Sequence, residues 1–409
     1  MAALAIVLAM AVLAHPVIST TSSTAAAPGS STADTRNFTI ASPPSTAASG
    51  PVTYVFGDSM SDVGNNNFFP VSLAKSNYPW YGIDYPRREA TGRFTNGKTI
   101  GDYMAEKFGV PPPPPFLSLR MTGKDVLGGI NFASGGAGIL NETGVYFVQY
   151  LSFDEQISCF ETVKKAMIAT IGNEAAEAAV NAALFQIGLG SNDYINNFLQ
   201  PFMADGTTYT HDQFIRLLIT TLDRQLKARD RSNQHCHPRS RLYGLGARKV
   251  VFNSLAPLGC IPSQRVRSTD GKCLSHVNDY ALQFNAAAKK LLDGMNAKLP
   301  GAQMGLADCY SVVMDLIQHP VENGFTTAHT SCCNVDTEVG GLCLPNTRPC
   351  SDRSKFVFWD AYHTSDAANK VIADRLWAGM TGATALPPRT GASYSPVTAP
   401  SPSPSQDDY

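Results

Sequence analysis

Short apolar runs alternate along the chain with longer segments of helical spacing. The runs are rich in β-branched and aromatic residues, which is typical of buried strands, and they cover residues 52–56, 184–187, 249–252 and 356–359. Apolar side chains recurring every three and four residues predict helices over 99–108, 174–183, 211–226, 277–299 and 366–380. This alternation predicts an α/β fold in which helices flank a mostly parallel sheet.

Polar segments directly follow three of the predicted strands. They are Gly57-Asp58-Ser59, the segment Gly188 to Asp193, and the segment Asp360 to His363. In an open parallel sheet, ligands bind at the carboxyl ends of the strands. We therefore expect the three segments to meet at one edge of the sheet.

Both ends of the chain lack this alternation. The apolar, charge-free segment 1–14 is too short to span a bilayer, so residues 1–27 are interpreted as a signal peptide, cleaved after Ala14 or within 25–27. A buried N-terminal helix is the alternative. Residues 28–50 have the composition of a disordered leader and 385–409 that of a Pro/Ser-rich tail, which leaves a folded domain over 51–384. No later segment is long and apolar enough to predict a membrane span.

The net charge limits the possible binding partners, and the cysteine content indicates the cellular compartment. The formal net charge of -1 argues against nucleic acid or an anionic membrane as the main partner. Clustered cysteines favour disulfides in a secreted protein, and the candidates are Cys260, Cys273, Cys332, Cys333, Cys343 and Cys350. A zinc site is the rival interpretation, but no Cys-x-x-Cys pair occurs and adjacent cysteines suit tetrahedral chelation poorly. The total of nine leaves at least one free thiol, for which Cys236 and Cys309 are the candidates.

Two Asn-x-Thr triplets, at Asn37 and Asn141, would accept N-linked glycans in a secreted chain. Such triplets also arise often by chance, so they add only weak support for secretion.

The three polar segments together contain what serine-based acyl transfer requires. An imidazole must accept the Oγ proton, and a carboxylate must hold that imidazole in one tautomer. Asp360 and His363 can supply both groups to Ser59, and Asn192 can donate to a developing oxyanion. Taken singly, each has an ordinary alternative as a helix cap, a strand-end cap or a turn residue.

Other motifs in the sequence give less information about function. The glycine-rich segment 131–138 lets backbone N–H groups approach a ligand, but it lacks the spacing and lysine of a phosphate-binding loop. Neither G-x-S-x-G nor H-E-x-x-H occurs. His235-Cys236-His237 lies in a basic stretch without a third metal ligand nearby, which favours a solvated loop.

Several segments, in this order, resemble the plant-type GDSL esterase/lipases of the SGNH hydrolase superfamily. The resemblance runs from about Val52 to about Met380 and rests on 57–67 (GDSMSDVGNNN), 82–84, 91–99, 131–134, 188–194, 246–249 and 257–262. It implies one three-layer α/β/α sandwich with a flavodoxin-like, mostly parallel sheet. It also implies that Ser59 is the nucleophile and that Asp360 and His363 complete its triad.

The same resemblance implies an oxyanion hole and a reaction. The donors would be the Ser59 N–H, Asn192 and a glycine of the second block, with Gly138 as first choice and Gly136 as second. The enzyme would cleave small or polymeric carboxylic esters through an acyl-enzyme, with no metal or organic cofactor, as a monomer secreted to the apoplast or cell wall. An acyltransferase using the same site and a non-catalytic secreted binding protein are the alternatives.

Three positions depart from the family pattern. Met60 stands where leucine is usual, and the similar volume predicts little effect. Thr364 follows His363 where proline is usual, and we expect a looser turn there. Residues 227–241 form a basic insertion, interpreted as a surface loop, with binding of an anionic wall polymer or a gene-model artefact as alternatives.

Overall fold

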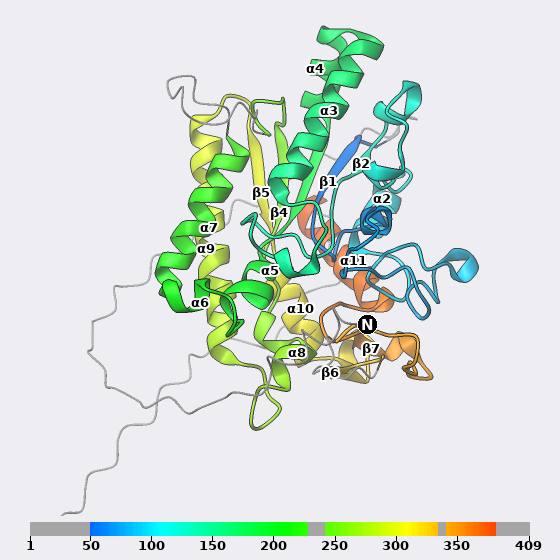
Figure 1. The fold of residues 1–409 in the computed structure, drawn as a ribbon, viewed down its shortest axis with the longest axis vertical. Helices are drawn as coiled ribbons and strands as arrows, with labels where there is room; N and C mark the ends of the chain where they lie inside the picture. The colour runs from blue at the N-terminus through cyan, green and yellow to red at the C-terminus, as the bar shows by residue number, and fades with distance from the viewer. Residues whose placement is uncertain (1–49, 228–241, 334–340, 382–409) are drawn as a thin grey trace, which may run out of the picture.

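Figure 1 shows the fold in a computed structural model that describes residues 50–227, 242–333 and 341–381. The predicted signal peptide, nearly all of the leader with Asn37, and the Pro/Ser-rich tail lie outside the described residues. So do Cys236 with its flanking histidines and all but the first residue of the basic insertion.

Five parallel strands form the central sheet, which confirms the predicted α/β class. Their order is β2-β1-β3-β4-β5. Their bounds are Ile130–Asn131 for β2, Thr53–Gly57 for β1, Leu184–Gly188 for β3, Lys249–Asn253 for β4 and Gln303–Ala307 for β5. In this doubly wound order the direction of progression reverses between β1 and β3, so a ligand crevice is expected at the carboxyl ends of those two strands.

Helices cover both faces of the sheet (Figure 1). Side chains alternate between the faces along each strand, so Tyr54, Phe185 and Phe252 enter the larger core while Leu184 and Val251 enter a smaller one. The larger core packs under α3 (Phe153–Ile171), α4 (Asn173–Ala182), α7 (His211–Leu226) and α9 (Ser275–Lys298). The smaller core packs under α2 (Ile100–Phe108) and α11 (Asp366–Thr381).

The remaining elements are short or lie at the sheet edges. The α-helices are α5 (Ser191–Asp193), α6 (Asp205–Thr208), α8 (Pro262–Arg265) and α10 (Cys309–Gln318), and η6 (Tyr194–Phe198) is a π-helix. The 3₁₀ turns are η1 (Asn65–Phe68), η2 (Pro86–Arg88), η3 (Phe116–Ser118), η4 (Gly123–Val126), η5 (Val145–Phe147), η7 (Leu258–Cys260), η8 (Val321–Asn323) and η10 (Arg353–Lys355).

All five predicted helices are confirmed to within two residues at each end, but α3 and α10 were missed. The signal for α3 is present in the sequence: Ser152 and Glu155 form a capping box at its start. The same device begins α2 at Thr99 and α7 at Thr210.

The strand predicted at 356–359 exists, but it does not join the central sheet. It forms β7 (Phe356–Phe358), which pairs in parallel with β6 (Thr327–Ser331) in a separate two-stranded sheet. The sequence of β6, TAHTS, carries no apolar alternation, so the partner of β7 could not be anticipated.

All six disulfide candidates are paired. The bonds join Cys332 to Cys350 and Cys333 to Cys343 beside the small sheet, and Cys260 to Cys273 elsewhere. Cys309 is free, as predicted, and the other free thiol among the described residues is Cys159, which was not anticipated.

Candidate active site

Ser59 lies just beyond the carboxyl end of β1 and is partly exposed. The strand end before it is fixed by the buried Gln156 of α3, whose amide accepts from the Gly57 N–H at 2.9 Å and donates to the Gly57 carbonyl at 2.8 Å. The Asp58 N–H donates to the Gly188 carbonyl of β3 at 3.3 Å. Both contacts restrict the backbone immediately before Ser59.

His363 lies beside Ser59, although the two residues come from different sheets. Its Nε2 is 2.8 Å from Ser59 Oγ. Its Nδ1 is 2.8 Å from each carboxylate oxygen of Asp360. The carboxylate is fully buried and the imidazole nearly so. This contact sequence of hydroxyl, imidazole and carboxylate is the arrangement that lets serine lose its proton during attack on a carbonyl.

The Asp360 carboxylate is held by more than the imidazole. Its Oδ1 accepts from the backbone N–H groups of Tyr362 at 2.9 Å and His363 at 2.8 Å. Its Oδ2 accepts from the Tyr81 hydroxyl at 2.7 Å, and that hydroxyl accepts from the Cys343 N–H at 3.1 Å. Burial, together with the charge of Asp360, holds the pKa of Tyr81 well above its ordinary value, so the phenol stays a donor.

Several N–H groups near this centre are free to bind an anionic oxygen. In the described part of the chain, the backbone N–H groups of Ser59, Gly136 and Gly138 donate no hydrogen bond. Asn192, at the start of α5, uses one amide hydrogen on the Ala137 carbonyl at 2.8 Å, which leaves its second hydrogen available. The predicted asparagine therefore lies against the predicted glycine-rich segment.

Three further buried carboxylates shape the surrounding loops. Burial raises the pKa of Asp58 and of Asp62 to about 6, and that of Asp193 to about 7. Asp62 accepts from the N–H groups of Gly64 and Gly135, and Asp193 accepts from those of Ile139 and Leu140. These carboxylates fix backbone rather than point at Ser59 Oγ.

Thr364 does not loosen the turn after the histidine, contrary to the sequence-based expectation. Its hydroxyl donates to Asn369 Oδ1 at 2.5 Å, and its carbonyl accepts from the Thr95 hydroxyl at 3.1 Å. The residue is buried. These two hydrogen bonds restrain the turn that follows His363.

Asn141 is exposed, and its side-chain amide donates to Asp154 at 2.9 Å. Thr143 of the same triplet is fully buried and donates to Asp193 at 2.8 Å. Glycosylation at Asn141 stays a prediction.

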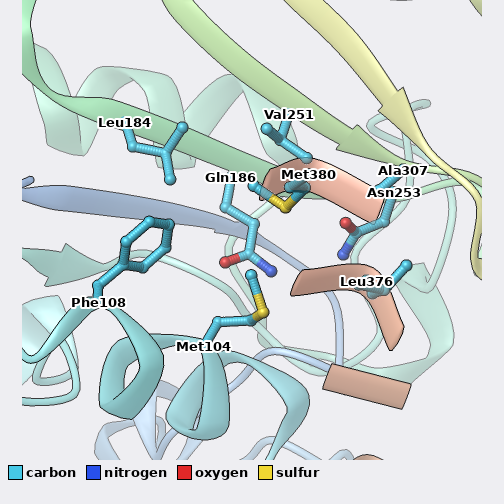
Figure 2. A pocket seen from close by; sticks show the side chains of 9 residues that line it. All are labelled: Met104, Phe108, Leu184, Gln186, Val251, Asn253, Ala307, Leu376 and Met380. Atoms are coloured by element: carbon cyan, nitrogen blue, oxygen red, sulfur yellow. The ribbon is translucent and has the colours of Figure 1, made fainter. Parts of the chain in front are cut away.

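A small cavity lies on the α2/α11 side of the central sheet (Figure 2). Gln186 and Asn253 reach into it from the strands, and Met104 and Phe108 line it from α2. Its volume is about 10 Å³, room for roughly one water molecule. It is too small for an ester, and neither Ser59 nor His363 lines it.

Two general features of the described residues complete the description. None of the helices within them has the length and hydropathy needed to cross a bilayer. Within the same ranges, no three His, Cys, Asp or Glu side chains gather in a way that could hold a metal ion.

The sequence did not point to Tyr81 or Gln156 as parts of the site. Tyr81 immediately precedes the block Gly82-Ile83-Asp84, so its position was close to a recognised signal, but nothing local links it to a carboxylate at Asp360. Gln156 lies in the helix that was missed.

Comparison with known proteins agrees with this geometry. The GDSL-like lipase/acylhydrolase family profile matches residues 54–376. A GDSL esterase/lipase of Arabidopsis thaliana is 55% identical over 84% of this chain and 92% of its own length. A second one from the same plant is 41% identical over 87% of this chain and 94% of its own, and GDSL esterase/lipase 7 is 39% identical over 80% and 88%. The chain therefore belongs to the GDSL family of lipases and acylhydrolases, whose members act on carboxylic esters.

Proposed function

We propose that this protein is a secreted serine esterase that cleaves carboxylic esters through an acyl-enzyme on Ser59. The observation that carries the proposal is the unbroken contact from Ser59 Oγ through His363 to Asp360, with 2.8 Å at each step. Secretion is supported by the three disulfides, which persist in oxidising compartments.

In this mechanism His363 Nε2 takes the Ser59 proton as the oxygen attacks the ester carbonyl. The tetrahedral intermediate collapses, and the leaving alcohol takes a proton from His363 Nε2. Water then attacks the acyl-enzyme and gives its proton to the same nitrogen. Collapse of this second tetrahedral intermediate releases the acid, and Ser59 Oγ recovers its proton from His363 Nε2. Asp360 holds the imidazole and stabilises its protonated form throughout.

The oxyanion would be bound by the Ser59 N–H, the free hydrogen of Asn192, and Gly136 rather than Gly138. The described chain contains no cis peptide bond, so the Ala137 carbonyl and the Gly138 N–H point in opposite directions. Because that carbonyl faces Asn192, the Gly138 N–H points away from it. The Gly136 N–H donates no hydrogen bond within the described chain, and φ of +91° at Gly136 suits glycine. This reverses the order of preference drawn from sequence.

Hydrolysis of a short chromogenic ester by matched serine variants tests the proposal. Ser59→Ala should lower kcat by roughly 10⁴-fold or more. Asn192→Ala should lower it by about 10²–10³-fold. Ser61→Ala is the control, because Ser61 is buried two residues away and its side chain makes no contact with the triad. An organophosphorus ester should add its mass to wild type and to Ser61→Ala but not to Ser59→Ala. Equal labelling or equal turnover of the Ser59→Ala variant would refute the proposal.

A further inference from the structure

Exposed apolar side chains, together with one half-buried tyrosine, gather beside the site on three separate loops. We call Leu73, Val145, Tyr146, Val148 and Phe202 the apolar rim. Four of them are large aliphatic or aromatic side chains in contact with solvent, with exposed fractions of 47% for Leu73, 57% for Val145, 59% for Val148 and 53% for Phe202. Single exposed apolar residues are ordinary, but a contiguous group of them marks a binding surface.

The three loops are joined to one another. The Tyr146 ring lies 4.6 Å from that of Phe147 and 5.9 Å from that of Phe202. The Leu73 N–H donates to the Phe147 carbonyl at 3.0 Å. The rim is therefore one connected surface rather than scattered side chains.

This surface begins at the reacting centre. A Cβ added to Gly136 would lie 2.5 Å from Phe147 Cδ2. The ring of Phe147, which lies in the chain between Tyr146 and Val148, therefore packs directly on the glycine proposed to bind the oxyanion. On the other side, the rim approaches Tyr362 through Tyr146. Burial raises the pKa of Tyr146, and the nearby Tyr362 raises it further. The Tyr362 ring is 6.1 Å from the ring of His363.

Val148 is held in an unfavourable conformation that keeps its side chain in solvent. Its φ is +71°, in the left-handed region that β-branched residues rarely adopt. The turn is fixed by hydrogen bonds from the Val148 N–H to the Val145 carbonyl and from the Val71 N–H to Gln149 Oε1. Strain maintained next to a reacting centre is characteristic of functional loops.

We propose that the apolar rim binds the alkyl part of the acyl group, so that the enzyme prefers medium-chain acyl esters to acetates. This inference rests on the proposed function. The rim meets the site directly at Phe147, whose ring touches Gly136. Its approach to His363, where the alcohol oxygen must lie to receive its proton, is indirect, through Tyr146 and Tyr362. The acyl side is therefore favoured over the alcohol side. An alkyl chain gains by leaving water for such a surface.

Two ester series, each kept below its critical micelle concentration, test the assignment. One lengthens the acyl chain from C2 to C8 on a constant chromogenic alcohol, and the other lengthens the alcohol of an acetate. For wild type, kcat/KM in the acyl series should rise about two- to fourfold per methylene. Val148→Thr and Phe202→Ser, on different loops, should each lower the C8/C2 ratio by roughly fivefold to tenfold.

Val321→Ser is the matched control, because Val321 is 78% exposed and lies in η8, outside the three loops that form the rim. It should leave the C8/C2 ratio unchanged. Melting temperatures within about 3 °C of wild type establish that the variants are folded, and the two loops provide independent tests.

The outcomes separate this inference from the proposed function. If wild type shows no Ser59-dependent cleavage even of the C2 ester, the proposed function fails and the rim assignment falls with it. If the C2 ester is cleaved but the C8/C2 ratio is the same in wild type and rim variants, only the rim assignment is overturned. It is equally overturned if the variants alter the alcohol series instead, or if the rim proves to be covered by a second copy of the chain in solution.

Discussion

Removing the Tyr81 hydroxyl tests whether the triad carboxylate must be anchored from outside its own loop. Tyr81→Phe deletes the donor to Asp360 Oδ2 at 2.7 Å and the acceptor of the Cys343 N–H at 3.1 Å. The ring itself stays packed, because its edge contacts with Phe94 and Trp359, at 6.2 Å and 6.3 Å, do not involve the hydroxyl. The change therefore removes these two hydrogen bonds, together with the interaction between the Tyr81 and Tyr78 hydroxyls.

The expected loss of stability follows from which polar groups lose a hydrogen-bond partner, namely Asp360 Oδ2 and the Cys343 N–H. A hydrogen bond to a buried charged oxygen contributes roughly 1.5–3 kcal/mol, and an unpaired buried N–H costs about 1 kcal/mol more. The sum, about 2.5–4 kcal/mol, should lower the melting temperature by roughly 4–6 °C in a domain of this size.

The expected loss of activity is smaller and has a different signature. Oδ1 keeps its two backbone donors, so Asp360 stays in place but Oδ2 is free to shift against His363 Nδ1. Poorer orientation of the imidazole should lower kcat by about fivefold to thirtyfold. KM should not change, since the Tyr81 hydroxyl is buried and does not reach substrate.

Steady-state kinetics at 20 °C, well below the melting temperature, measure this effect without interference from unfolding. Tyr243→Phe is the matched control, because its hydroxyl bonds only to the distant Pro300 carbonyl, at 2.9 Å. If Tyr81→Phe melts earlier but keeps kcat within twofold of wild type, Tyr81 stabilises the fold and does not position the triad.

Two other buried ionisable groups, Arg93 and Asp193, give testable effects on stability. Arg93 forms a bidentate pair with Asp102 at 2.7 Å, and Arg93→Met should lower the free energy of unfolding in urea by about 3–5 kcal/mol, with partial recovery when Asp102→Asn is added. For Asp193, burial raises the pKa to about 7, so the folded state retains a proton that the unfolded state releases near pH 4. The stability it contributes is complete below pH 4 and is lost as the pH rises through 7. The free energy of unfolding of wild type, measured relative to Asp193→Asn, should therefore fall by about 4 kcal/mol between pH 4 and pH 7.5, and a flat difference would contradict the assignment.

The grouping of Ser59 with Asn192 could be anticipated from sequence because the strand-end rule applies without knowledge of distant contacts. Ser59 and Asn192 follow adjacent parallel strands, and the pairing of Gly57 with Gly188 brings them together. His363 is 304 residues from Ser59, yet it too follows an apolar run that could be recognised as a strand. What could not be anticipated was that this strand belongs to a different sheet.

The proposals that go beyond the sequence depend on the direction of a group rather than on residue type. Both Gly136 and Gly138 are glycines in one loop, and only the orientation of the peptide between Ala137 and Gly138 distinguishes their N–H groups. Tyr81 looks like any aromatic residue in a loop until its hydroxyl is placed against Asp360. Neither the orientation of a peptide nor the distant partner of a hydroxyl produces a periodicity or composition that can be recognised in a sequence.

Residues 91–99 contain no candidate catalytic residue, but they connect the two separate sheets. The proposed nucleophile, Ser59, follows a strand of the central sheet, and the proposed base, His363, follows a strand of the small one. Their 2.8 Å contact therefore requires the two sheets to be held in register. Residues of this block make that connection: the Thr95 hydroxyl donates to the Thr364 carbonyl, and Asn96 Oδ1 accepts from the Asp366 N–H at 2.8 Å.

The same block is anchored on its other side to the loop that follows the nucleophile. Arg93 donates to the Val63 carbonyl at 3.4 Å while paired with Asp102 of α2, and the Phe94 ring lies 5.1 Å from the His363 ring. Because its contacts run to both halves of the triad, a change in this block should separate Ser59 from His363 before it unfolds either sheet. The measured consequence in Arg93→Met would be a fall in kcat at temperatures where the protein is still folded, and a variant that loses stability but keeps kcat would show that the sheets hold their register without it.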